Sequence, residues 1–382
     1  MKYDVVVVGG RISGSIASLY ASKQDINVLM IEKNQEIGTP VQCAGGVSRS
    51  FFKTLEMKPP QKLICSEIEG AVLHAPDGEK FITKNSMLQG YIMERKMLDK
   101  TLAIKSAEAG TEIMLKTQVK DLIIEKGQVK GVIVRHQGNL IEIPSKIVIG
   151  ADGVESQIAR MAGLHDGYNP HDLVSCAQYE MVGVDIHPEL LEFHFGYNQA
   201  PGGYVWIFPK GENRANIGLG IRYGDNPAIY HLNKFVSSLK GKIVELNVGA
   251  VPISGPLKKT YSSGILLTGD AAGHVDPVTG GGMHLSAICS SLAGKIAADA
   301  VICENLSSSY LSRYEKEWKK RIGKNLQQSL KYRTIFDKLD DEELNGLIKF
   351  LNTNDFKSLS SLSILKLARE YPKLFRILKN IL

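Results

Sequence analysis

Residues 3–15 read YDVVVVGGRISGS, a β-branched run followed by a glycine turn and the start of a helix. The run from Tyr3 to Val8 is typical of a strand buried on both faces. In a dinucleotide-binding loop of this form, Gly9 makes the tight turn and Gly14 lets the helix pack closely on the strand. The helix N-terminus then presents free N–H groups to a pyrophosphate. The stretch therefore predicts a Rossmann-like nucleotide-binding domain.

Two nearby residues refine this prediction. Arg11 stands where the loop pattern has its middle glycine, and a Cβ atom there restricts how closely the backbone approaches phosphate. Glu32 ends the next predicted strand, 28–31, about 20 residues beyond the loop, where an acid accepts hydrogen bonds from ribose hydroxyls. An acid there disfavours the 2′-phosphate of NADP. The alternative for Glu32, an exposed acid after a strand, stays open at this point.

Two glycine-containing segments far downstream favour a flavin. Residues 267–273 read LTGDAAG, a strand end at which the Asp270 carboxylate can meet the ribityl or pyrophosphate part of a flavin. Residues 276–282 read DPVTGGG and lead into a helix. Gly281 and Gly282 let the backbone approach a flat ring, and the helix N-terminus stabilises negative charge on reduced flavin. Unless this segment is a flexible linker, the predicted cofactor is FAD.

The predicted elements of the two halves are interleaved along the chain. The predicted fold class is α/β (α+β), with a Rossmann-like FAD-binding domain interleaved with an antiparallel β-sheet substrate domain, followed by a helical C-terminal region. The FAD-binding domain is expected at residues 1–62, 91–165 and 258–302, the β-rich substrate domain at 63–90 and 166–257, and the helical region at 303–382.

Composition excludes several classes of protein. The 382 residues carry a net charge of +6 and five cysteines without a Cys-x-x-Cys pair. That pattern argues against a secreted disulfide scaffold, a zinc ribbon or a ferredoxin-type iron–sulfur module. The cysteines are Cys43, Cys65, Cys176, Cys289 and Cys303. No metal-ligand spacing stands out, so no metal site is predicted, and we expect no nucleic-acid partner.

The chain opens directly into a strand, so we expect no signal peptide. No uninterrupted apolar run reaches the roughly 20 residues of a membrane-spanning helix. Much of the positive charge lies between Lys316 and Arg333. This stretch could face an acidic protein or anionic lipid, or it could be a solvated helix face. The expectation is a cytoplasmic protein with peripheral contact to the inner face of the cell membrane.

Five motifs carry a resemblance to a known family. The phosphate loop, Ala151-Asp152-Gly153 and Gly269-Asp270 mark the para-hydroxybenzoate-hydroxylase-like flavoproteins. Narrower motifs are PVQCAG at 40–45 and YVWIFP at 204–209, the latter followed by GLG at 218–220. They match the P-x-x-C-x-G and Y-x-W-x-F-P…G-x-G patterns of archaeal geranylgeranyl reductases. Over essentially its full length the chain resembles these enzymes, specifically the digeranylgeranylglycerophospholipid reductases.

The resemblance implies a set of site residues. Glu94-Arg95, at a predicted helix start, resembles the arginine that contacts FAD in the superfamily, and Val119 falls where a backbone contact to adenine is expected. Further cofactor contacts are implied at Gln42, Cys43, Gly45 and Asp152. Cys43 is also the candidate catalytic residue. A buried small residue, a proton relay and a redox thiol all remain open for it.

The aromatic motif is also interpretable from strand geometry. Tyr204, Trp206 and Phe208 project on one face of a strand, and a following turn returns a strand that carries Gly218 and Gly220. Missing side chains at the glycines could leave a trough beside an aromatic wall, shaped for a long apolar chain. These five residues are the predicted substrate-binding set. The alternative is aromatic core packing over a bulge.

The implied reaction is FAD-dependent reduction of the isoprenoid C=C bonds of geranylgeranyl chains on archaeal glycerophospholipids. The sequence contains no second dinucleotide loop, which favours ferredoxin or transiently bound NAD(P)H as the electron donor. His274 and His284 flank the triglycine segment, where each is more often structural than catalytic. Two alternatives remain: an FAD-dependent aromatic-ring monooxygenase, and a non-catalytic prenyl-lipid carrier.

Overall fold

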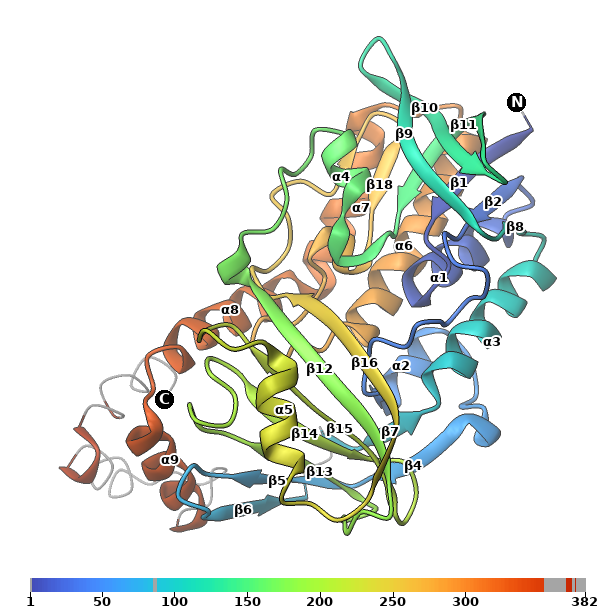
Figure 1. The fold of residues 1–382 in the computed structure, drawn as a ribbon. Coiled ribbons are helices and arrows are strands. Elements are labelled where there is room, and N and C mark those ends of the chain that lie inside the picture. The colour runs from blue at the N-terminus through green and yellow to red at the C-terminus, as the bar shows by residue number, and fades with distance from the viewer. Residues whose placement is uncertain (1, 85–87, 354–368, 373–374, 376–382) are drawn as a thin grey trace.

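The computed structural model describes residues 2–84, 88–353, 369–372 and 375. In the folded molecule these residues form two large β-sheets, one at each end, with helices between and around them (Figure 1). Helix α8 (Lys324–Phe336) leads from the first lobe along the second, and α9 (Asp341–Thr353) lies at the far end of the second lobe (Figure 1). The predicted mixture of an α/β lobe, a β-rich lobe and C-terminal helices is confirmed for the described residues.

The first sheet has the order β17-β18-β11-β1-β2-β8, and β9 and β10 continue from β11 as an antiparallel meander. Its strands are β1 (Tyr3–Val8), β2 (Val28–Ile31), β8 (Glu112–Met114), β9 (Thr117–Glu125), β10 (Gln128–His136), β11 (Asn139–Gly150), β17 (Tyr261–Ser262) and β18 (Ile265–Leu267). Strands β2, β1, β11 and β18 run parallel. Their carboxyl ends therefore meet at one edge, where ligands bind in open parallel sheets.

The two faces of the first sheet pack against different elements. Val5 and Val7 pack against α1, α6 and α7, whereas Val6 and Val8 pack against the β9–β10 meander and α4. This division follows from the alternation of side chains along a strand. The helices of this lobe are α1 (Ile12–Ser22), α2 (Arg49–Thr54), α3 (Arg95–Glu108), α4 (Gln157–Met161), α6 (Met283–Ile302) and α7 (Ser308–Trp318).

Helix α6 bears on the expectation that no apolar run is long enough to span a membrane. In the described part of the chain it is long and apolar enough to cross a membrane, with a mean hydropathy of 1.5 over the relevant window. Its alanine and isoleucine side chains raise the mean, although Lys295 and Asp299 interrupt the apolar run. However, 72% of that window is buried inside the protein. A Cβ atom on Gly294 would lie 2.2 Å from the carbonyl oxygen of Ala17, so α6 packs against α1 as a core helix.

The second sheet has the order β16-β12-β15-β14-β13-β5-β6. Its strands are β5 (Gly70–His74), β6 (Lys80–Thr83), β12 (Leu173–Val182), β13 (Leu190–His194), β14 (Tyr204–Pro209), β15 (Arg214–Ile221) and β16 (Lys242–Pro252). All neighbours are antiparallel except β13 and β5, which pair in parallel. Helix α5 (Ala228–Val236) packs on one face through Leu232 and Val236, which leaves the other face for the site.

A small third sheet joins the two lobes. It consists of β3 (Gly46–Ser48), β7 (Gly90–Met93) and β4 (Ile64–Ile68). The predicted boundaries at residues 62/63 and 90/91 place β4 in one domain and β3 in the other, although both pair with β7. The domain boundaries therefore stay a prediction. Beyond α7, the described C-terminal residues form a π-helical segment (Lys319–Gly323), α8 (Lys324–Phe336) and α9 (Asp341–Thr353).

Candidate active site

One cavity of about 2030 Å³ runs from the carboxyl edge of the first sheet to the inner face of the second sheet and on to α8 and α9. Ordinary small-molecule pockets measure about 300–1,000 Å³, so this one has room for a dinucleotide and a second long ligand. Its walls include most of the predicted site residues: Gly9, Glu32, Gln42, Cys43, Arg95, Val119, Asp152, Asp270, Gly281, Gly282, Tyr204, Trp206, Phe208 and Gly220. Gly14, Gly45 and Gly218 lie behind the walls.

The phosphate loop has the glycine geometry that the sequence predicts. Gly9 has a φ of +103°, and a Cβ atom there would lie 2.3 Å from the carbonyl oxygen of Ala151. A Cβ atom on Gly14 would lie 1.7 Å from the carbonyl oxygen of Gly9. Helix α1 begins at Ile12 without a side-chain cap, so its first N–H groups are available to a phosphate.

The Arg11 side chain turns towards the segment that contains Cys43. Its guanidinium donates hydrogen bonds to the Pro40 carbonyl oxygen at 2.5 Å and to Gln42 Oε1 at 2.7 Å. A charged donor shared between these two acceptors fixes the 40–42 backbone beside the loop. Arg11, which departs from the glycine pattern, thus makes a tertiary contact with residues 40–42 that sequence spacing alone does not show.

Glu32 is a buried, oriented carboxylate, so the alternative of an exposed acid is wrong. It is 5% exposed at the end of β2. Its Oε2 accepts a hydrogen bond from Gly10 N at 2.8 Å, and its Oε1 accepts from Asn34 N and Nδ2 at 2.9 and 2.8 Å. In dinucleotide-binding folds, an acid fixed in this position beside the phosphate loop accepts hydrogen bonds from the ribose hydroxyls.

Several buried polar atoms of the residues that line the cavity lack hydrogen-bond partners among the described residues, and two of them lie beside the phosphate loop. These two atoms are Nε of Arg95 and Oδ1 of Asp152. Arg95 is otherwise held by Asp99 at 3.1 Å, and the other Asp152 oxygen accepts a hydrogen bond from Ile158 N at 3.0 Å. Burial raises the pKa of Asp152. Buried polar groups are rarely left unpaired, so a donor and an acceptor in one wall fit a polar ligand such as FAD.

The triglycine segment is a fixed loop, which contradicts the flexible-linker alternative. Asp276 Oδ1 accepts hydrogen bonds from Val278 N and Thr279 N, at 3.0 and 2.8 Å, and its Oδ2 accepts from Ser329 Oγ on α8 at 2.6 Å. The Tyr204 hydroxyl donates to the Thr279 carbonyl oxygen at 2.5 Å. The loop is thus held between the aromatic motif and α8. It leads into α6, whose N-terminus has no side-chain cap.

Asp270 lies close to this loop. A Cβ atom on Gly282 would lie 3.3 Å from Asp270 Oδ1, so the glycine leaves the carboxylate open towards the cavity. Burial raises the pKa of Asp270, while Arg95 and Arg11 oppose that rise. Their charges therefore favour the ionised carboxylate, the form that accepts hydrogen bonds from ribityl hydroxyls.

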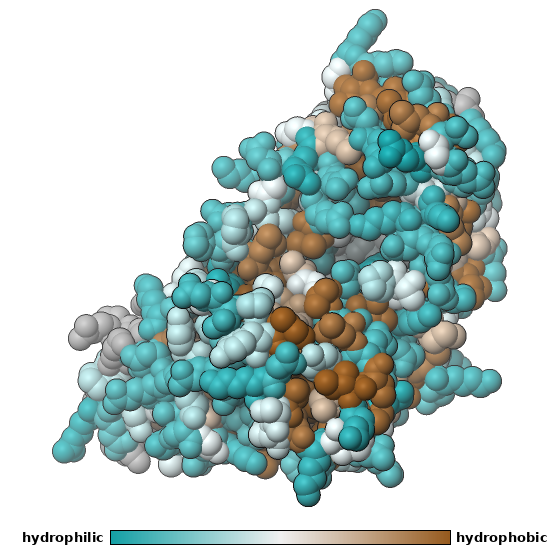
Figure 2. All heavy atoms as spheres, in the orientation of Figure 1, coloured by the Kyte–Doolittle hydropathy of each residue, from teal (hydrophilic) through white to brown (hydrophobic). Residues whose placement is uncertain are grey.

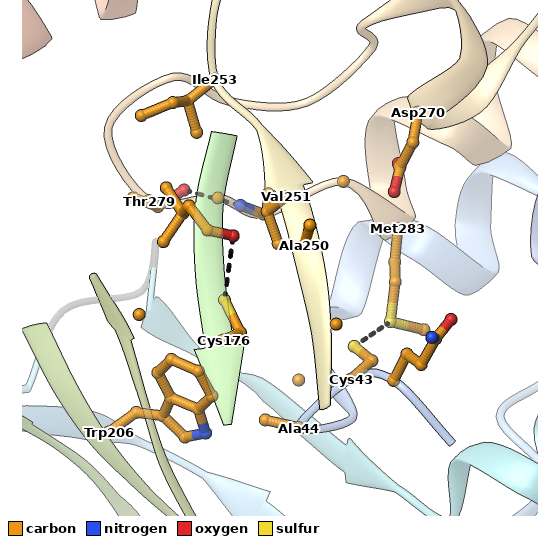
Figure 3. A pocket seen from close by; sticks show the side chains of 18 of the residues that line it. Cys43, Ala44, Cys176, Trp206, Ala250, Val251, Ile253, Asp270, Thr279 and Met283 are labelled. Carbon is orange, nitrogen blue, oxygen red and sulfur yellow. Dashed lines mark hydrogen bonds between the residues drawn. The ribbon is translucent and has the colours of Figure 1, made fainter. Parts of the chain in front are cut away.

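Two thiols lie in the cavity wall, Cys176 between Thr279 and Trp206 and Cys43 beside Met283 (Figure 3). Cys43 Sγ lies 3.7 Å from Met283 Sδ at the start of α6, and it accepts a hydrogen bond from Gly45 N at 3.5 Å. Cys176 lies on β12 opposite Gly220, and burial raises the pKa of its thiol to about 12. The sequence offered no signal for Cys176, because its place depends on strand register. The catalytic role of Cys43 stays a prediction.

The aromatic motif differs from the expected trough at one position. Tyr204 pairs with Gly220, and Trp206 pairs with Gly218. A Cβ atom on Gly218 would lie 2.5 Å from the Trp206 indole, whose Nε1 donates to Gln178 Oε1 at 3.0 Å. The indole therefore occupies the space above Gly218, and the glycine supports the aromatic wall from behind. Gly220 lines the cavity itself.

The two histidines beside the triglycine loop have different surroundings. His284 lines the cavity, and its Nε2 lies 3.0 Å from Thr54 Oγ1. His274 is fully buried against Tyr314 and Trp318, away from the cavity wall. Neither ring nitrogen of His274 has a partner among the described residues. A structural role for His274 follows from this packing.

Replacing His274 with phenylalanine should make the free energy of unfolding depend less on pH below pH 6.5. Burial lowers the pKa of His274 from 6.5 to about 3, so below pH 6.5 only the unfolded chain takes up this proton. The free energy of unfolding therefore falls by about 1.4 kcal/mol per pH unit as pH drops from 6.5 towards 3. Urea unfolding at pH 7 and pH 5 should show the wild type losing about 2 kcal/mol more than the variant. Equal losses would contradict this assignment.

Comparisons with known proteins agree with this geometry. A family model described as FAD dependent oxidoreductase matches residues 4–171, and one described as geranylgeranyl reductase catalytic domain matches residues 172–251. Digeranylgeranylglycerophospholipid reductase 2 of Methanothermobacter thermautotrophicus is 49% identical over 100% of both chains. The digeranylgeranylglycerophospholipid reductase of Methanocaldococcus jannaschii is 40% identical over 100% of this chain and 98% of its own.

Solved structures give the same picture. A geranylgeranyl bacteriochlorophyll reductase-like protein from Thermoplasma acidophilum has a TM-score of 0.90 at 33% identity, covering 100% of this chain and 99% of that one. The flavin-dependent brominase Bmp2 has a TM-score of 0.67 at 18% identity, over 97% and 99% of the two chains, which shows a shared fold alone. The chain belongs to the digeranylgeranylglycerophospholipid reductase family of flavin-dependent oxidoreductases, with FAD as its cofactor.

Proposed function

We propose that the protein reduces the C=C bonds of geranylgeranyl chains on glycerophospholipids, which yields saturated archaeal membrane lipids. The observation that carries the proposal is a single cavity that joins the FAD anchors to a long apolar compartment. The apolar part is lined by side chains in or next to the second sheet, the small third sheet and the C-terminal helical region: Ile68, Leu73, Phe81, Leu191, Phe193, Phe195, Leu339, Leu344 and Leu347. A saturated or isoprenoid hydrocarbon chain is stabilised there by removal from water.

The chain's own residues orient the substrate and exclude water. Reduced FAD, when bound, supplies the hydride that adds to one alkene carbon. Tyr204 and Trp206 form the wall beside the triglycine loop, and their fixed hydrogen bonds keep an alkene in one orientation. The second alkene carbon needs a proton. Cys43 and Cys176 present sulfur in the wall, and the raised pKa of Cys176 keeps its proton on Sγ at neutral pH.

An anaerobic experiment tests this proposal. The purified protein is reduced with dithionite, freed of excess reductant, and mixed under argon with geranylgeranyl glycerophospholipid. Flavin reoxidation, with lipid mass rising by two hydrogens per step, is the expected result. Saturated phytanyl lipid serves as the control and should leave the flavin reduced. A flavin that is reoxidised by oxygen alone would favour the monooxygenase, and protein that stays colourless after addition of FAD would favour the lipid carrier.

For the electron donor we propose ferredoxin or transiently bound NAD(P)H, since the sequence contains a single dinucleotide loop. We also propose a cytoplasmic protein that touches the inner face of the membrane. Val244, Leu246 and Val248 share one side of edge strand β16 and are 57%, 52% and 58% exposed. Figure 2 shows apolar atoms over β16. Val248 also lines the cavity, so this apolar edge is continuous with the lipid compartment.

The basic stretch between Lys316 and Arg333 supports the same membrane contact. Most of its cationic side chains are exposed on α7, α8 and the segment between them: Lys316, Lys319, Lys320, Arg321, Lys324 and Lys331. Basic side chains near a bilayer are attracted to anionic headgroups. Co-sedimentation with anionic phospholipid vesicles at low ionic strength is the expected result. Protein that stays in the supernatant at every salt concentration would contradict membrane contact.

A further inference from the structure

We propose that His74, Glu192 and His194 form a binding site for a divalent transition metal, with Zn²⁺ as the ion. These three residues form a group whose ligand atoms all lie within 4.8 Å of one another. The sequence predicted no metal site, because its ligands come from strands that are far apart in the chain. The proposal is independent of the lipid reduction described above.

The second sheet brings the three residues together on its outer face. Glu192 and His194 are two residues apart on β13, so they project to the same side. His74 lies directly opposite His194 in the parallel β5–β13 pair. The intervening residues Leu73 and Phe193 project to the other side and line the cavity. The proposed metal site is therefore separated from the lipid compartment by the thickness of the sheet.

The ligand atoms converge on one carboxylate oxygen. His74 Nε2 lies 2.9 Å and His194 Nε2 lies 3.8 Å from Glu192 Oε2. The two imidazole rings are stacked, with centroids 3.8 Å apart and planes inclined by 15°. Phe235 of α5 packs edge-on against His194 at 5.0 Å, which shields the group from solvent. The three side chains are only 10%, 13% and 17% exposed.

One of the nitrogens is unpartnered. His194 Nε2 is buried and has no hydrogen-bond partner among the described residues. An unpaired buried nitrogen costs free energy, and a metal ion in the space between the three side chains would satisfy it. Two imidazoles and a carboxylate are a donor set that Zn²⁺ prefers, with Zn–N and Zn–O distances of about 2.0–2.2 Å and a fourth position left for water.

The charges of the group fit a cation. Metal ligands must be deprotonated. Burial lowers the pKa of His194 to about 4, so its imidazole is neutral near pH 7. Burial is the largest effect on Glu192 and opposes its ionisation, but the His74 hydrogen bond and the charges of the nearby histidines together lower the pKa of that carboxyl. Lys80 and His187 are the other charged or titratable groups that act on this pair.

The ion would connect two strands that are far apart in the sequence and adjacent in the sheet. Strand β5 comprises residues 70–74, and β13 comprises residues 190–194. The two strands pair in parallel and form the part of the sheet behind the cavity wall. A metal bridge between them would hold Leu73 and Phe193 in place on the opposite face. This is a structural role, since the ion lies away from the reacting groups.

The test uses full-length protein without a histidine tag, stripped with EDTA and dialysed. Calorimetric titration with Zn²⁺ should give one ion per chain, and Co²⁺ should give visible d–d absorption bands that Zn²⁺ abolishes. Glu192→Gln and His194→Ala should each weaken Zn²⁺ binding by more than about 100-fold, since loss of a direct ligand exceeds the effect of a supporting residue. Circular dichroism melting curves show whether each variant is folded.

His231→Ala is the matched control. His231 lies on α5, and both of its ring nitrogens are also buried without partners among the described residues, but it is outside the three-residue group. This variant should bind Zn²⁺ as the wild type does. Wild-type protein that takes up no stoichiometric Zn²⁺ would overturn the proposal, whatever the variants do. Binding that survives unchanged in Glu192→Gln would overturn it equally.

Discussion

Replacing Gly14 with alanine is expected to abolish FAD binding, because the added methyl group has no space. A Cβ atom at this position would lie 1.7 Å from the carbonyl oxygen of Gly9, in the backbone of the phosphate loop. Helix α1 would have to move away from β1, at a cost of about 3 kcal/mol or more in overpacking. Expressed as cofactor affinity, that is a loss of at least about 100-fold. Flavin absorbance per mole of purified protein measures the effect.

A second helical glycine supplies the control. Gly323 ends the π-helical segment Lys319–Gly323, where the nearest atom to an added Cβ is the Lys319 Cβ at 3.4 Å. Gly323→Ala should keep full flavin content, and its stability should be unchanged or up to about 1 kcal/mol higher, because alanine favours a helix. Wild-type flavin content in Gly14→Ala would mean that close packing of α1 on the loop is not needed to hold the cofactor.

The nucleotide half of the site was predictable because its signals are local. The turn at Gly9, the acid at Glu32 and the glycines before α6 each sit next to the strand or helix that positions them. Parallel strands then bring the three segments to one edge by a general rule of such sheets. Short-range spacing therefore suffices for this part of the fold.

Other features depend on pairing between distant segments, which spacing does not encode. The expected antiparallel sheet contains the parallel pair β5–β13, whose strands are more than a hundred residues apart in sequence. That pairing places His74 beside Glu192, and the register of β12 against β15 places Cys176 opposite Gly220. None of these contacts can be inferred from a periodicity of two along one strand.

The segment around Cys43 shows how a local pattern can hide a tertiary contact. Arg11 departs from the glycine pattern, and from the sequence it weakens the prediction of close phosphate contact. In the structure its guanidinium binds the Pro40 carbonyl oxygen and Gln42. Similarly, Ser329 on α8 binds Asp276, so the C-terminal helices support the loop beside the flavin. Such contacts become visible only once both partners have been placed.

Replacing Gly218 with alanine is expected to remove most lipid reduction while leaving FAD bound. The new Cβ atom would lie 2.5 Å from the Trp206 indole and 2.8 Å from the carbonyl oxygen of Ala177. The backbone oxygen cannot move cheaply, so the indole must tilt into the cavity and lose its hydrogen bond to Gln178. A displacement of about 1 Å in a substrate-positioning group can lower turnover about 100-fold. Steady-state rates with geranylgeranyl glycerophospholipid, normalised to flavin content, measure the loss.

Two further variants separate this effect from general damage to the sheet. At Gly249 on β16 an added Cβ would meet Gln42 Cβ at an ordinary 3.6 Å, so Gly249→Ala should reduce the rate much less. In Gly218→Ala combined with Trp206→Phe, the indole atoms that clash are absent, and thermal stability should recover towards the wild type. If Gly218→Ala retains full turnover, the indole is not held against this glycine, and the aromatic wall must be supported in another way.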